Sequence, residues 1–171
     1  MDFIYTQIYK SPCGELIIGS YKDRICLCDW NIYERRTKID KIIGRDFNAE
    51  FKDGLTPIIS ETILQLDRYF GGELCEFENI DMSIGGTMFQ QLVWKELCEI
   101  GYGMTISYKD LARRLNRATS IRAVANAVGL NPISILIPCH RIIGSDGKLT
   151  GYAGGLDAKQ FLIDLETSKN R

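Results

Sequence analysis

The stretch NPISILIPCHR, residues 131–141, runs from a turn through an apolar segment into a thiol, an imidazole and a guanidinium. Asn131-Pro132 is a turn signal, and the apolar residues 133–137 predict a buried strand that delivers Cys139. A cysteine placed there is predicted to be a nucleophile, although free cysteines are also often buried as small hydrophobes. His140 is the only histidine in the chain, so the one side chain with an ordinary pKa near neutrality adjoins this thiol.

Two short helices are predicted immediately upstream. Ser107 begins the first with a cap-like pattern and Asn116 ends it, and a short connection then reaches Ser120, which begins the second. The inner faces are apolar, with Leu111, Ala112 and Leu115 on the first helix and Ile121, Val124, Ala125 and Val128 on the second. Arg122 and Asn126 face outward. Two short helices joined by a tight turn match the helix-turn-helix pattern, which also occurs in helical domains that bind nothing.

Basic residues are concentrated in this region. The segment between Thr105 and Asn131 holds one acidic residue, Asp110, and five basic ones, Lys109, Arg113, Arg114, Arg117 and Arg122. The whole chain has a net charge of −1, so the local excess of positive charge stands out. Such a face is typical of nucleic-acid binding, while a solvated helix surface is the other interpretation.

The flanking segments predict two further helices. Thr87 and Gln90 form a capping-box pattern that begins a helix ending before Gly101. Its predicted buried stripe is Phe89, Leu92, Val93, Leu97 and Ile100. The final helix is predicted over residues 157–166, packed through Phe161, Leu162 and Leu165. A glycine pair, Gly85-Gly86, precedes the first of these helices and marks the predicted boundary between two lobes.

The amino-terminal part predicts an antiparallel meander. Residues 3–9, 16–18 and 25–30 alternate or run apolar and are separated by turn signals. Residues 34–54 are predicted to be a connection with little regular structure. Thr56-Pro57 then opens a helix with the stripe Ile59, Ile63, Leu66 and Phe70, which Gly71-Gly72 ends. Residues 73–86 are predicted to contain a short strand.

Composition restricts the class of protein. The 171 residues suffice for one compact domain or two small lobes, and 45% hydrophobic with 25% charged residues is ordinary for a globular chain. The six cysteines form no CxxC pair, so reduced thiols are expected rather than a disulfide scaffold or a thiolate zinc site. No apolar run approaches the roughly 20 residues of a membrane span, and the first residues do not resemble a signal peptide. An intracellular protein is expected.

A thiol reacts as its thiolate, and a free cysteine with a pKa of about 8.5 is only slightly ionised at neutral pH. His140, Arg141 and an ordered water are the available helpers for Cys139. Adjacent side chains of an extended segment point to opposite sides, so a relay through water is the easier geometry. A carboxylate on the last helix, Glu166 or Asp164, would complete the nucleophile, base and orienter arrangement.

Residues 138–143 (PCHRII), together with Asn131, Arg122 and residues 152–156 (YAGGL), resemble the O6-alkylguanine-DNA alkyltransferase family. The resemblance is specific over about residues 87–166 and looser before them. It implies an α+β fold with an amino-terminal ribonuclease H-like lobe over residues 1–84, a small antiparallel sheet plus helix. A helical DNA-binding and alkyl-acceptor domain over residues 85–171 would carry the helix-turn-helix and the cysteine loop.

The resemblance implies irreversible, single-turnover transfer of an alkyl group from O6 of guanine, and less readily O4 of thymine, onto the protein's own cysteine. Cys139 matches the acceptor, and His140 and Glu166 match the relay that forms the thiolate through water. Asn131 matches the asparagine that braces the cysteine loop. Tyr108 matches the tyrosine that helps rotate the damaged nucleotide and protonates the departing guanine.

The same resemblance implies a set of DNA and substrate contacts. Arg122 matches the side chain that enters the base stack while its helix lies in the minor groove. The matching DNA-binding set is Arg122, Tyr108, Ser120, Ala123, Ala125 and Asn126, and the matching pocket set is Ser134, Tyr152, Ala153 and Gly154. Extruding a nucleotide costs about a few kcal/mol, which an inserted side chain partly offsets. A monomer that binds double-stranded DNA and no membrane is expected, in the cytoplasm or, in a eukaryote, the nucleus.

Three departures from the family pattern limit what is carried over. Some members hold zinc in the amino-terminal lobe, but no histidine is present there, so neither a metal nor a cofactor is expected. Ser134 stands where some members have proline, which leaves acceptance of bulky groups such as benzyl open. Ala153 replaces a serine found in some members. The acceptor Cys139 is present, unlike in related proteins that bind alkylated DNA without transfer.

Two other functions remain open from the residues themselves. A cysteine hydrolase or acyltransferase would use Cys139 and His140 with an oxyanion hole and repeated turnover, and Arg122 and Asn131 would then be bystanders. A helix-turn-helix regulator would read bases in the major groove and use Cys139 only for packing.

Overall fold

The computed structural model describes residues 1–116 and 120–168 of the chain. These form two compact units, Met1–Gly86 and Thr87–Arg171. Helices and strands occur together in a mixed arrangement, which confirms the predicted α+β class. No helix in the described part of the chain combines the length and the apolar character that crossing a membrane requires.

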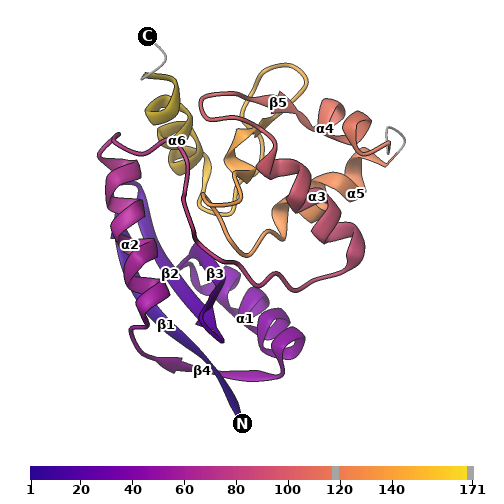
Figure 1. Cartoon of the computed structure of the whole chain (residues 1–171). Helices are drawn as coiled ribbons and strands as arrows, with labels where there is room; N and C mark the ends of the chain where they lie inside the picture. The colour runs from indigo at the N-terminus through magenta and orange to yellow at the C-terminus, as the bar shows by residue number, and fades with distance from the viewer. Residues whose placement is uncertain (117–119, 169–171) are drawn as a thin grey trace. The chain divides into compact units, whose positions relative to one another are not determined.

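A four-stranded sheet is the centre of the first unit (Figure 1). Its strands are β1 (Asp2–Ser11), β2 (Gly14–Tyr21), β3 (Arg24–Trp30) and β4 (Ala49–Asp53), in the order β3-β2-β1-β4. The first three strands form the predicted antiparallel meander. The fourth strand pairs with β1 in parallel, from Asp2 opposite Ala49 to Thr6 opposite Asp53.

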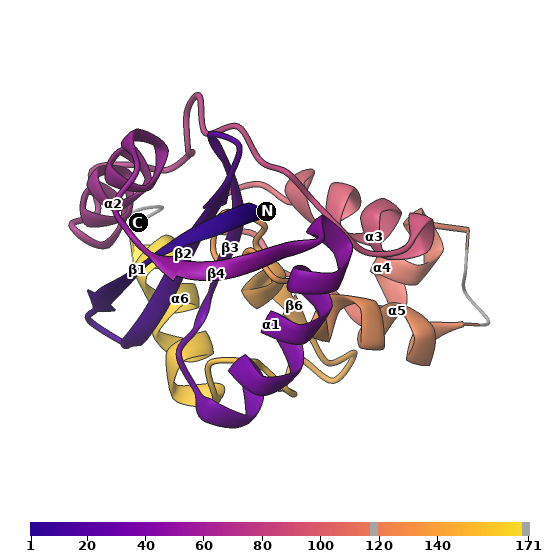
Figure 2. The same cartoon turned by 90° about the horizontal axis from the view of Figure 1, so that it is seen from below.

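The prediction of an irregular connection over residues 34–54 is wrong. This segment contains α1 (Tyr33–Phe47) and then β4, and Figure 2 shows the helix leading directly into the strand. The buried apolar side chains of α1 are Ile39 and Ile43, so apolar residues recur with only a weak helical period in its sequence. Ion pairs add to the few apolar contacts of this helix. Arg35 donates a hydrogen bond to the buried Asp29 carboxylate at 2.7 Å.

Helix α2 (Pro57–Phe70) forms as predicted and packs against β1, β2 and β3. The Thr56 hydroxyl accepts a hydrogen bond from the Ile59 amide at 3.4 Å, which satisfies one free donor of the first turn. The predicted strand in residues 73–86 is reduced to an isolated bridge between Met82 and Ile25. This bridge covers part of the open edge of β3.

The second unit consists mainly of helices. They are α3 (Met88–Cys98), α4 (Tyr108–Arg114), α5 (Ile121–Gly129) and α6 (Leu156–Ser168), with a short helical turn η1 (Cys139–Arg141). Two short strands, β5 (Ile106–Ser107) and β6 (Ile142–Ile143), pair in parallel. The predicted capping box of α3 is confirmed, since Thr87 and Gln90 exchange hydrogen bonds at 2.9 and 3.2 Å.

The predicted helix pair before the cysteine stretch is confirmed as α4 and α5, which contact each other. The connection through residues 117–119 lies outside the described residues. The inward assignment of Ile121 is wrong, because its side chain is exposed, and Ala127 is buried instead. Trp94 of α3 is also buried and donates its indole N–H to the carbonyl of Ala127 at 2.8 Å. This bond fixes α5 against α3.

Two other inward assignments are wrong. Leu92 of α3 and Phe161 of α6 are both exposed. The buried face of α6 consists instead of Ala158, Lys159, Leu162 and Glu166. Two charged side chains on the inner face of a helix are unusual, because burying an ion requires partners that compensate for lost hydration.

Candidate active site

The segment before Cys139 is folded by the Asn131 side chain. Its Oδ1 accepts from the Ile133 amide at 3.0 Å, and its Nδ2 donates to the carbonyls of Ile137 at 2.9 Å and Ile133 at 3.4 Å. Asn131 is buried. These bonds use backbone groups that a sheet ladder would need, so the predicted strand over residues 133–137 is wrong. The segment is instead a compact loop.

Within this loop Ile135 has a φ of +72°. A β-branched residue in the left-handed region is strained, at a cost of about 1–3 kcal/mol, and persists only where the surroundings hold it. The hydrogen bonds of Asn131 and the bond from the Ile137 amide to the Ile133 carbonyl at 3.0 Å supply that hold. A strained and braced loop therefore leads into Cys139.

Cys139 begins the turn η1, so the chain bends here rather than continuing extended. The Arg141 amide donates to the Pro138 carbonyl at 3.1 Å and closes this turn. The turn is followed at once by β6, whose Ile142 pairs with Ile106 of β5. Cys139 is 5% exposed. The thiol thus occupies a rigid, nearly buried position between a braced loop and a strand.

The imidazole of His140 is fully buried and contacts a buried carboxylate. Its Nε2 lies 2.7 Å from Oε1 of Glu166. Of the two carboxylates that the sequence left open, His140 therefore contacts Glu166, whereas Asp164 is exposed and accepts a hydrogen bond from Gln160 at 2.8 Å. The Nδ1 atom of His140 has no hydrogen-bond partner among the described residues. With Nε2 donating to Glu166, Nδ1 is the nitrogen that can accept a proton.

Glu166 is held as a carboxylate. Burial alone would raise the pKa of its carboxyl, but hydrogen bonds from His140 and Arg141 and the charges of both lower it well below its ordinary value. Burial lowers the pKa of His140, and the contact with Glu166 opposes that shift only in part. At neutral pH the pair therefore consists of a neutral imidazole and a carboxylate, which is the form able to take up a proton.

Arg141 fastens Glu166 from the other side. It donates from Nε to Oε2 at 2.8 Å and from Nη2 to Oε1 at 2.9 Å, while Nη1 donates to the carbonyl of Ile100. The backbone amide of Gly103 also donates to Oε2, at 3.1 Å. Such a two-point pair fixes the orientation of the carboxylate as well as its charge. This role of Arg141 was not predicted from the sequence.

Lys159 is a further site residue that sequence reasoning missed. Its side chain is fully buried, and its Nζ donates to the carbonyls of Thr150 at 3.0 Å and Gly151 at 3.4 Å. The rings of Tyr108 and Tyr152 each have their centroid 5.9 Å from Nζ. Lys159 lies two helical turns before Glu166, so the helical period alone places both on one face of α6 and could have indicated it.

Tyr108 is the first residue of α4, whose cap Ser107 accepts from the Asp110 amide at 3.0 Å. Burial and the charge of Cys139 raise the pKa of Tyr108, so its hydroxyl keeps its proton. The structure thus places a protonated Tyr108 hydroxyl on a ring that lies 5.9 Å from the Lys159 ammonium.

The outward face of α5 carries the predicted DNA-binding residues. Arg122, Ala123 and Asn126 are exposed, while Ala125 and Ser120 are half-buried. Among the predicted pocket residues, Ser134 is fully buried within the cysteine loop. Tyr152, Ala153 and Gly154 are half-buried in the segment that leads to α6.

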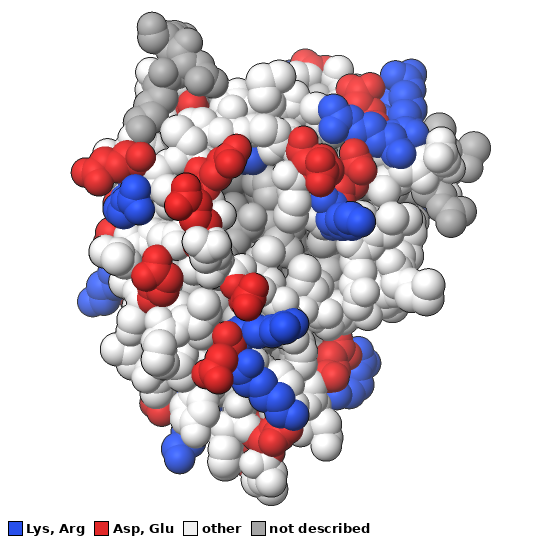
Figure 3. All heavy atoms as spheres, viewed as in Figure 1, with Lys and Arg blue, Asp and Glu red and all other residues white. Residues whose placement is uncertain are grey.

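The basic region of the sequence is partly neutralised. Lys109, Arg113 and Arg114 of α4 are exposed. Figure 3 shows basic and acidic side chains side by side at the end of the second unit where α4 lies. Arg113 pairs with Asp110 at 3.1 Å, and Arg114 pairs with Glu96 of α3 at 3.6 Å. The attraction of this surface for polyanions is therefore smaller than the count of basic residues implies.

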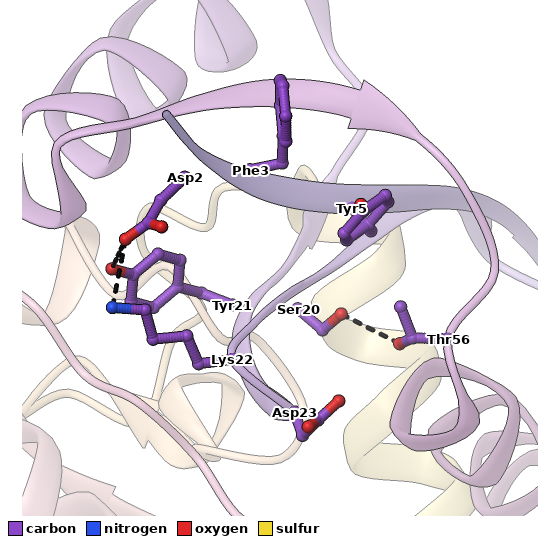
Figure 4. Close-up of a pocket in the computed structure, with 8 residues that line it drawn as sticks. All are labelled: Asp2, Phe3, Tyr5, Ser20, Tyr21, Lys22, Asp23 and Thr56. Carbon is purple, nitrogen blue, oxygen red and sulfur yellow. Dashed lines mark hydrogen bonds and ion pairs between the residues drawn. The ribbon is translucent and has the colours of Figure 1, made fainter.

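The first unit has a hollow of its own, shown in Figure 4. It has a volume of about 200 Å³ and is lined by side chains that include Phe3, Tyr5, Ser20 and Lys22. All its lining residues belong to the first unit, so it contains none of the groups around Cys139. Among the described residues, no group of three or more His, Cys, Asp or Glu side chains is arranged to hold a metal ion.

Comparisons with known proteins identify the family. Residues 4–84 match the ribonuclease-like domain of 6-O-methylguanine DNA methyltransferase, and residues 88–168 match its DNA binding domain. The methylated-DNA–protein-cysteine methyltransferase of Haemophilus influenzae is 44% identical over 168 residues, which cover 97% of this chain and 88% of that protein. This chain belongs to the 6-O-methylguanine DNA methyltransferase family.

Other members of the methyltransferase family agree in sequence and fold. The protein of the same name from Methanosarcina barkeri is 41% identical and is covered over its full length by 98% of this chain. The crystal structure of Mycobacterium tuberculosis OGT in complex with DNA matches with a TM-score of 0.80 at 37% identity, covering 98% of this chain and 94% of that chain. The resemblance stated from the cysteine stretch is thereby confirmed.

Proposed function

We propose that this member of the 6-O-methylguanine DNA methyltransferase family repairs DNA by moving a methyl or other alkyl group from O6 of guanine onto Cys139. O4-alkylthymine would be a poorer substrate. One observation carries the assignment of the acceptor: the Cys139 thiol directly precedes His140, whose buried ring is 2.7 Å from Glu166. The other thiols in the described residues are not followed by such a pair.

The proposed reaction balances without a cofactor. The Cys139 thiol loses its proton through a water molecule to His140 as the sulfur attacks the alkyl carbon. A sulfur–carbon bond forms while the bond from that carbon to O6 breaks, and its electron pair passes to the purine. Tyr108 donates a proton to the departing guanine and regains one from the site, so one proton moves in all from the thiol to guanine. The neutral His140 and anionic Glu166 support the first step.

The product explains a single turnover. Alkylated Cys139 is a thioether, and thiol exchange reverses a disulfide but not a thioether. No group in the proposed reaction removes the alkyl group again. Each protein molecule would therefore repair one lesion, and the conversion would stop at one alkyl group per chain.

Access to O6 requires the nucleotide to leave the base stack. We propose that α5 lies in the minor groove, where the small side chains of Ala123 and Ala125 permit close approach and Arg122 fills the gap. The exposure of Arg122, Ala123 and Asn126 supports this orientation. The pocket for the extruded base would be formed by Ser134, Tyr152, Ala153 and Gly154, with Asn131 bracing the loop behind it. The protein would bind double-stranded DNA as a monomer, in the cytoplasm or nucleus.

The decisive experiment is mass spectrometry of the intact protein and its peptides after incubation with a duplex containing one O6-methylguanine. We expect one added methyl group on the peptide containing Cys139. Cys75 and Cys98 are exposed, whereas Cys139 is buried. Non-specific alkylation would therefore appear first on the two exposed thiols, which serve as internal controls. An unmodified duplex is the second control.

Other outcomes would replace the proposal. Binding of the duplex without added mass would leave a lesion-binding or regulatory protein. Repeated turnover on a thioester with no lasting modification would favour a cysteine hydrolase or acyltransferase. Gel filtration of the free protein and of its DNA complex would test the proposed monomer.

A further inference from the structure

The exposed turn that follows β6 contains an aspartate directly before a glycine, Asp146-Gly147. In such a pair the glycine nitrogen can attack the aspartate side chain, because glycine has no Cβ to obstruct the five-membered ring that forms. The chain contains a second pair of this kind, Asp53-Gly54, at the end of β4. The two pairs have the same residues, so their structures decide which of them reacts.

The side chain of Asp146 is folded back over its own turn. Its Oδ1 accepts a hydrogen bond from the Lys148 amide at 3.1 Å. A Cβ added to Gly144 would lie 2.7 Å from the same oxygen. Because the carboxyl group reaches the amide two residues further on, its carbon lies close to the intervening peptide nitrogen of Gly147. These are the two atoms that ring closure joins.

The turn around Asp146 has room to rearrange. Gly147 is exposed, has a φ of +79°, and a Cβ added to it would meet nothing within 4 Å. Its amide donates to the Gly144 carbonyl at 2.9 Å, and this bond must open before the nitrogen attacks. Exposed turns open locally at a low cost in free energy.

The other pair, Asp53-Gly54, is fixed by the sheet. Asp53 pairs with Thr6 of β1, and the Gly54 amide donates to the Thr6 carbonyl at 3.0 Å. An extended strand directs a side chain away from the peptide that follows it. A Cβ added to Gly54 would lie 2.7 Å from the Tyr5 ring, so this backbone has little space to turn toward the carboxyl group.

We propose that Asp146-Gly147 is a site of spontaneous isomerisation and that the product impairs alkyl transfer. The Gly147 nitrogen attacks Cγ of the protonated Asp146 carboxyl group. A carbon–nitrogen bond forms, and the proton of the nitrogen leaves with the carboxyl hydroxyl as water. Water then hydrolyses the cyclic imide at the α-carbonyl of residue 146, which leaves isoaspartate. One water is released and one is consumed, and nothing is oxidised or reduced.

Isoaspartate lengthens the main chain by one methylene group between residues 146 and 147. This turn joins β6 to the proposed pocket segment, residues 150–154. The Gly144 amide donates to the Lys148 carbonyl at 2.9 Å, so the closed turn sets where that segment begins. A longer main chain displaces this starting point. The effect on transfer rests on the proposed function, whereas the isomerisation does not.

Peptide mass spectrometry of protein stored for several weeks at physiological temperature and pH tests the site. Isoaspartate and aspartate have equal mass, so electron-transfer fragmentation, which cleaves the additional main-chain carbon bond, identifies the isomer. We expect isoaspartate to accumulate at residue 146 at least about tenfold faster than at residue 53, since an exposed turn opens more often than a paired strand.

Single-turnover repair of the O6-methylguanine duplex by the same stored protein tests the consequence. We expect a fast and a slow phase, with the amplitude of the slow phase equal to the fraction of isoaspartate at residue 146. The slow phase should be about tenfold slower, because a displacement of about 1 Å in a positioned group costs up to about a hundredfold in rate. Fresh protein should show the fast phase alone.

Three variants provide the controls. Asp146→Ser keeps an oxygen that can accept from the Lys148 amide but has no carboxyl carbon to attack, so stored protein should retain a single fast phase. Asp146→Asn should convert faster, because ammonia is lost from an amide more readily than water from a carboxyl group, and its gain in mass reports the reaction. Asp53→Ser should age as the parent protein does.

The two parts of the proposal fail separately. Equal isoaspartate at residues 146 and 53 contradicts the site, as does none at residue 146 under storage that converts a short unstructured Asp-Gly peptide. Isoaspartate at residue 146 with a single fast phase contradicts the effect on transfer, and so does an equal loss of rate in stored Asp146→Ser. Fresh protein that transfers no methyl group contradicts the proposed function and leaves the isomerisation site unaffected.

Discussion

Arg141 donates one hydrogen bond to each oxygen of the Glu166 carboxylate, at 2.8 and 2.9 Å. Glu166 also contacts His140, so one buried carboxylate binds the guanidinium of Arg141 and the imidazole of His140. The pair thus contributes to stability and sets the basicity of the group proposed to receive the Cys139 proton.

Replacement of Glu166 by Gln leaves Arg141 buried without its counter-ion. We expect a loss of about 3–5 kcal/mol in the free energy of unfolding at pH 7, together with slow alkyl transfer. Urea denaturation measures the first and a single-turnover assay the second. Asp164→Asn alters an exposed carboxylate of the same helix and is the matched control. An equal loss of unfolding free energy in Asp164→Asn would mean that removing any carboxylate from α6 destabilises the protein, whether or not it pairs with Arg141.

The pH dependence of stability provides a second test of Glu166. Its folded pKa is lowered from an ordinary 4.5, so its stabilisation is complete above about pH 4.5 and is lost as the pH falls below that value. The difference in unfolding free energy between the parent protein and Glu166→Gln should therefore narrow from pH 4.5 to pH 3. A constant difference over that range contradicts a charged Glu166.

Cys139→Ala should abolish alkyl transfer and leave DNA binding largely intact, because the thiol is the acceptor and not a phosphate contact. Transfer is measured by mass spectrometry and binding by fluorescence anisotropy at fixed salt. Cys98→Ala is the control, since Cys98 is an exposed thiol of the same unit. Transfer at the parent rate in Cys139→Ala would assign the acceptor to another cysteine.

Arg122→Ala should slow repair of duplex DNA far more than reaction with a free O6-alkylated guanine base. The side chain is proposed to stabilise the extruded state, and a free base needs no extrusion. Arg113, exposed on α4 and paired with Asp110, provides the control variant Arg113→Ala. Equal losses on both substrates would mean that Arg122 supports only the fold.

Asn131→Ala should cost about 3 kcal/mol of unfolding free energy, because it leaves the buried Ile133 amide without its partner and removes two further hydrogen bonds that brace the strained loop. Transfer should fall with it, since the loop positions Cys139. Asn126 is exposed on α5, and Asn126→Ala should change stability by no more than about 0.5 kcal/mol. Urea denaturation of the two variants gives the comparison.

The sequence predicted the parts of the fold whose signals are local. Helix α3 begins at a capping box and α2 at a Thr-Pro pair, and both signals depend on a few neighbouring residues. The meander likewise follows from alternation and turns. Helix α1 was missed because its burial relies on Arg36, which pairs with Asp40 at 2.8 Å and lies 3.7 Å from Asp29 of another element. A charged residue on the buried face of a helix leaves a gap in the periodic apolar pattern.

The candidate site was predicted in the same uneven way. The contact of His140 with Glu166 was predicted from the resemblance of the sequence around Cys139 to the alkyltransferase family. The apolar run before Cys139 was mistaken for a strand because the three hydrogen bonds of Asn131 outweigh the β-propensity of residues 133–137. Lys159 was missed because a lysine on a helix is normally taken as a solvent-exposed residue.

The bond from the Trp94 indole to the Ala127 carbonyl gives the protein an optical signal at its proposed DNA-binding helix. The chain contains two tryptophans, Trp30 in the first unit and Trp94 in the second. In a Trp30→Phe variant, all indole emission would arise beside α5. A shift of that emission on addition of DNA would report a movement of α5 against α3. The change of the same emission with denaturant concentration would follow the unfolding of the second unit separately from that of the first.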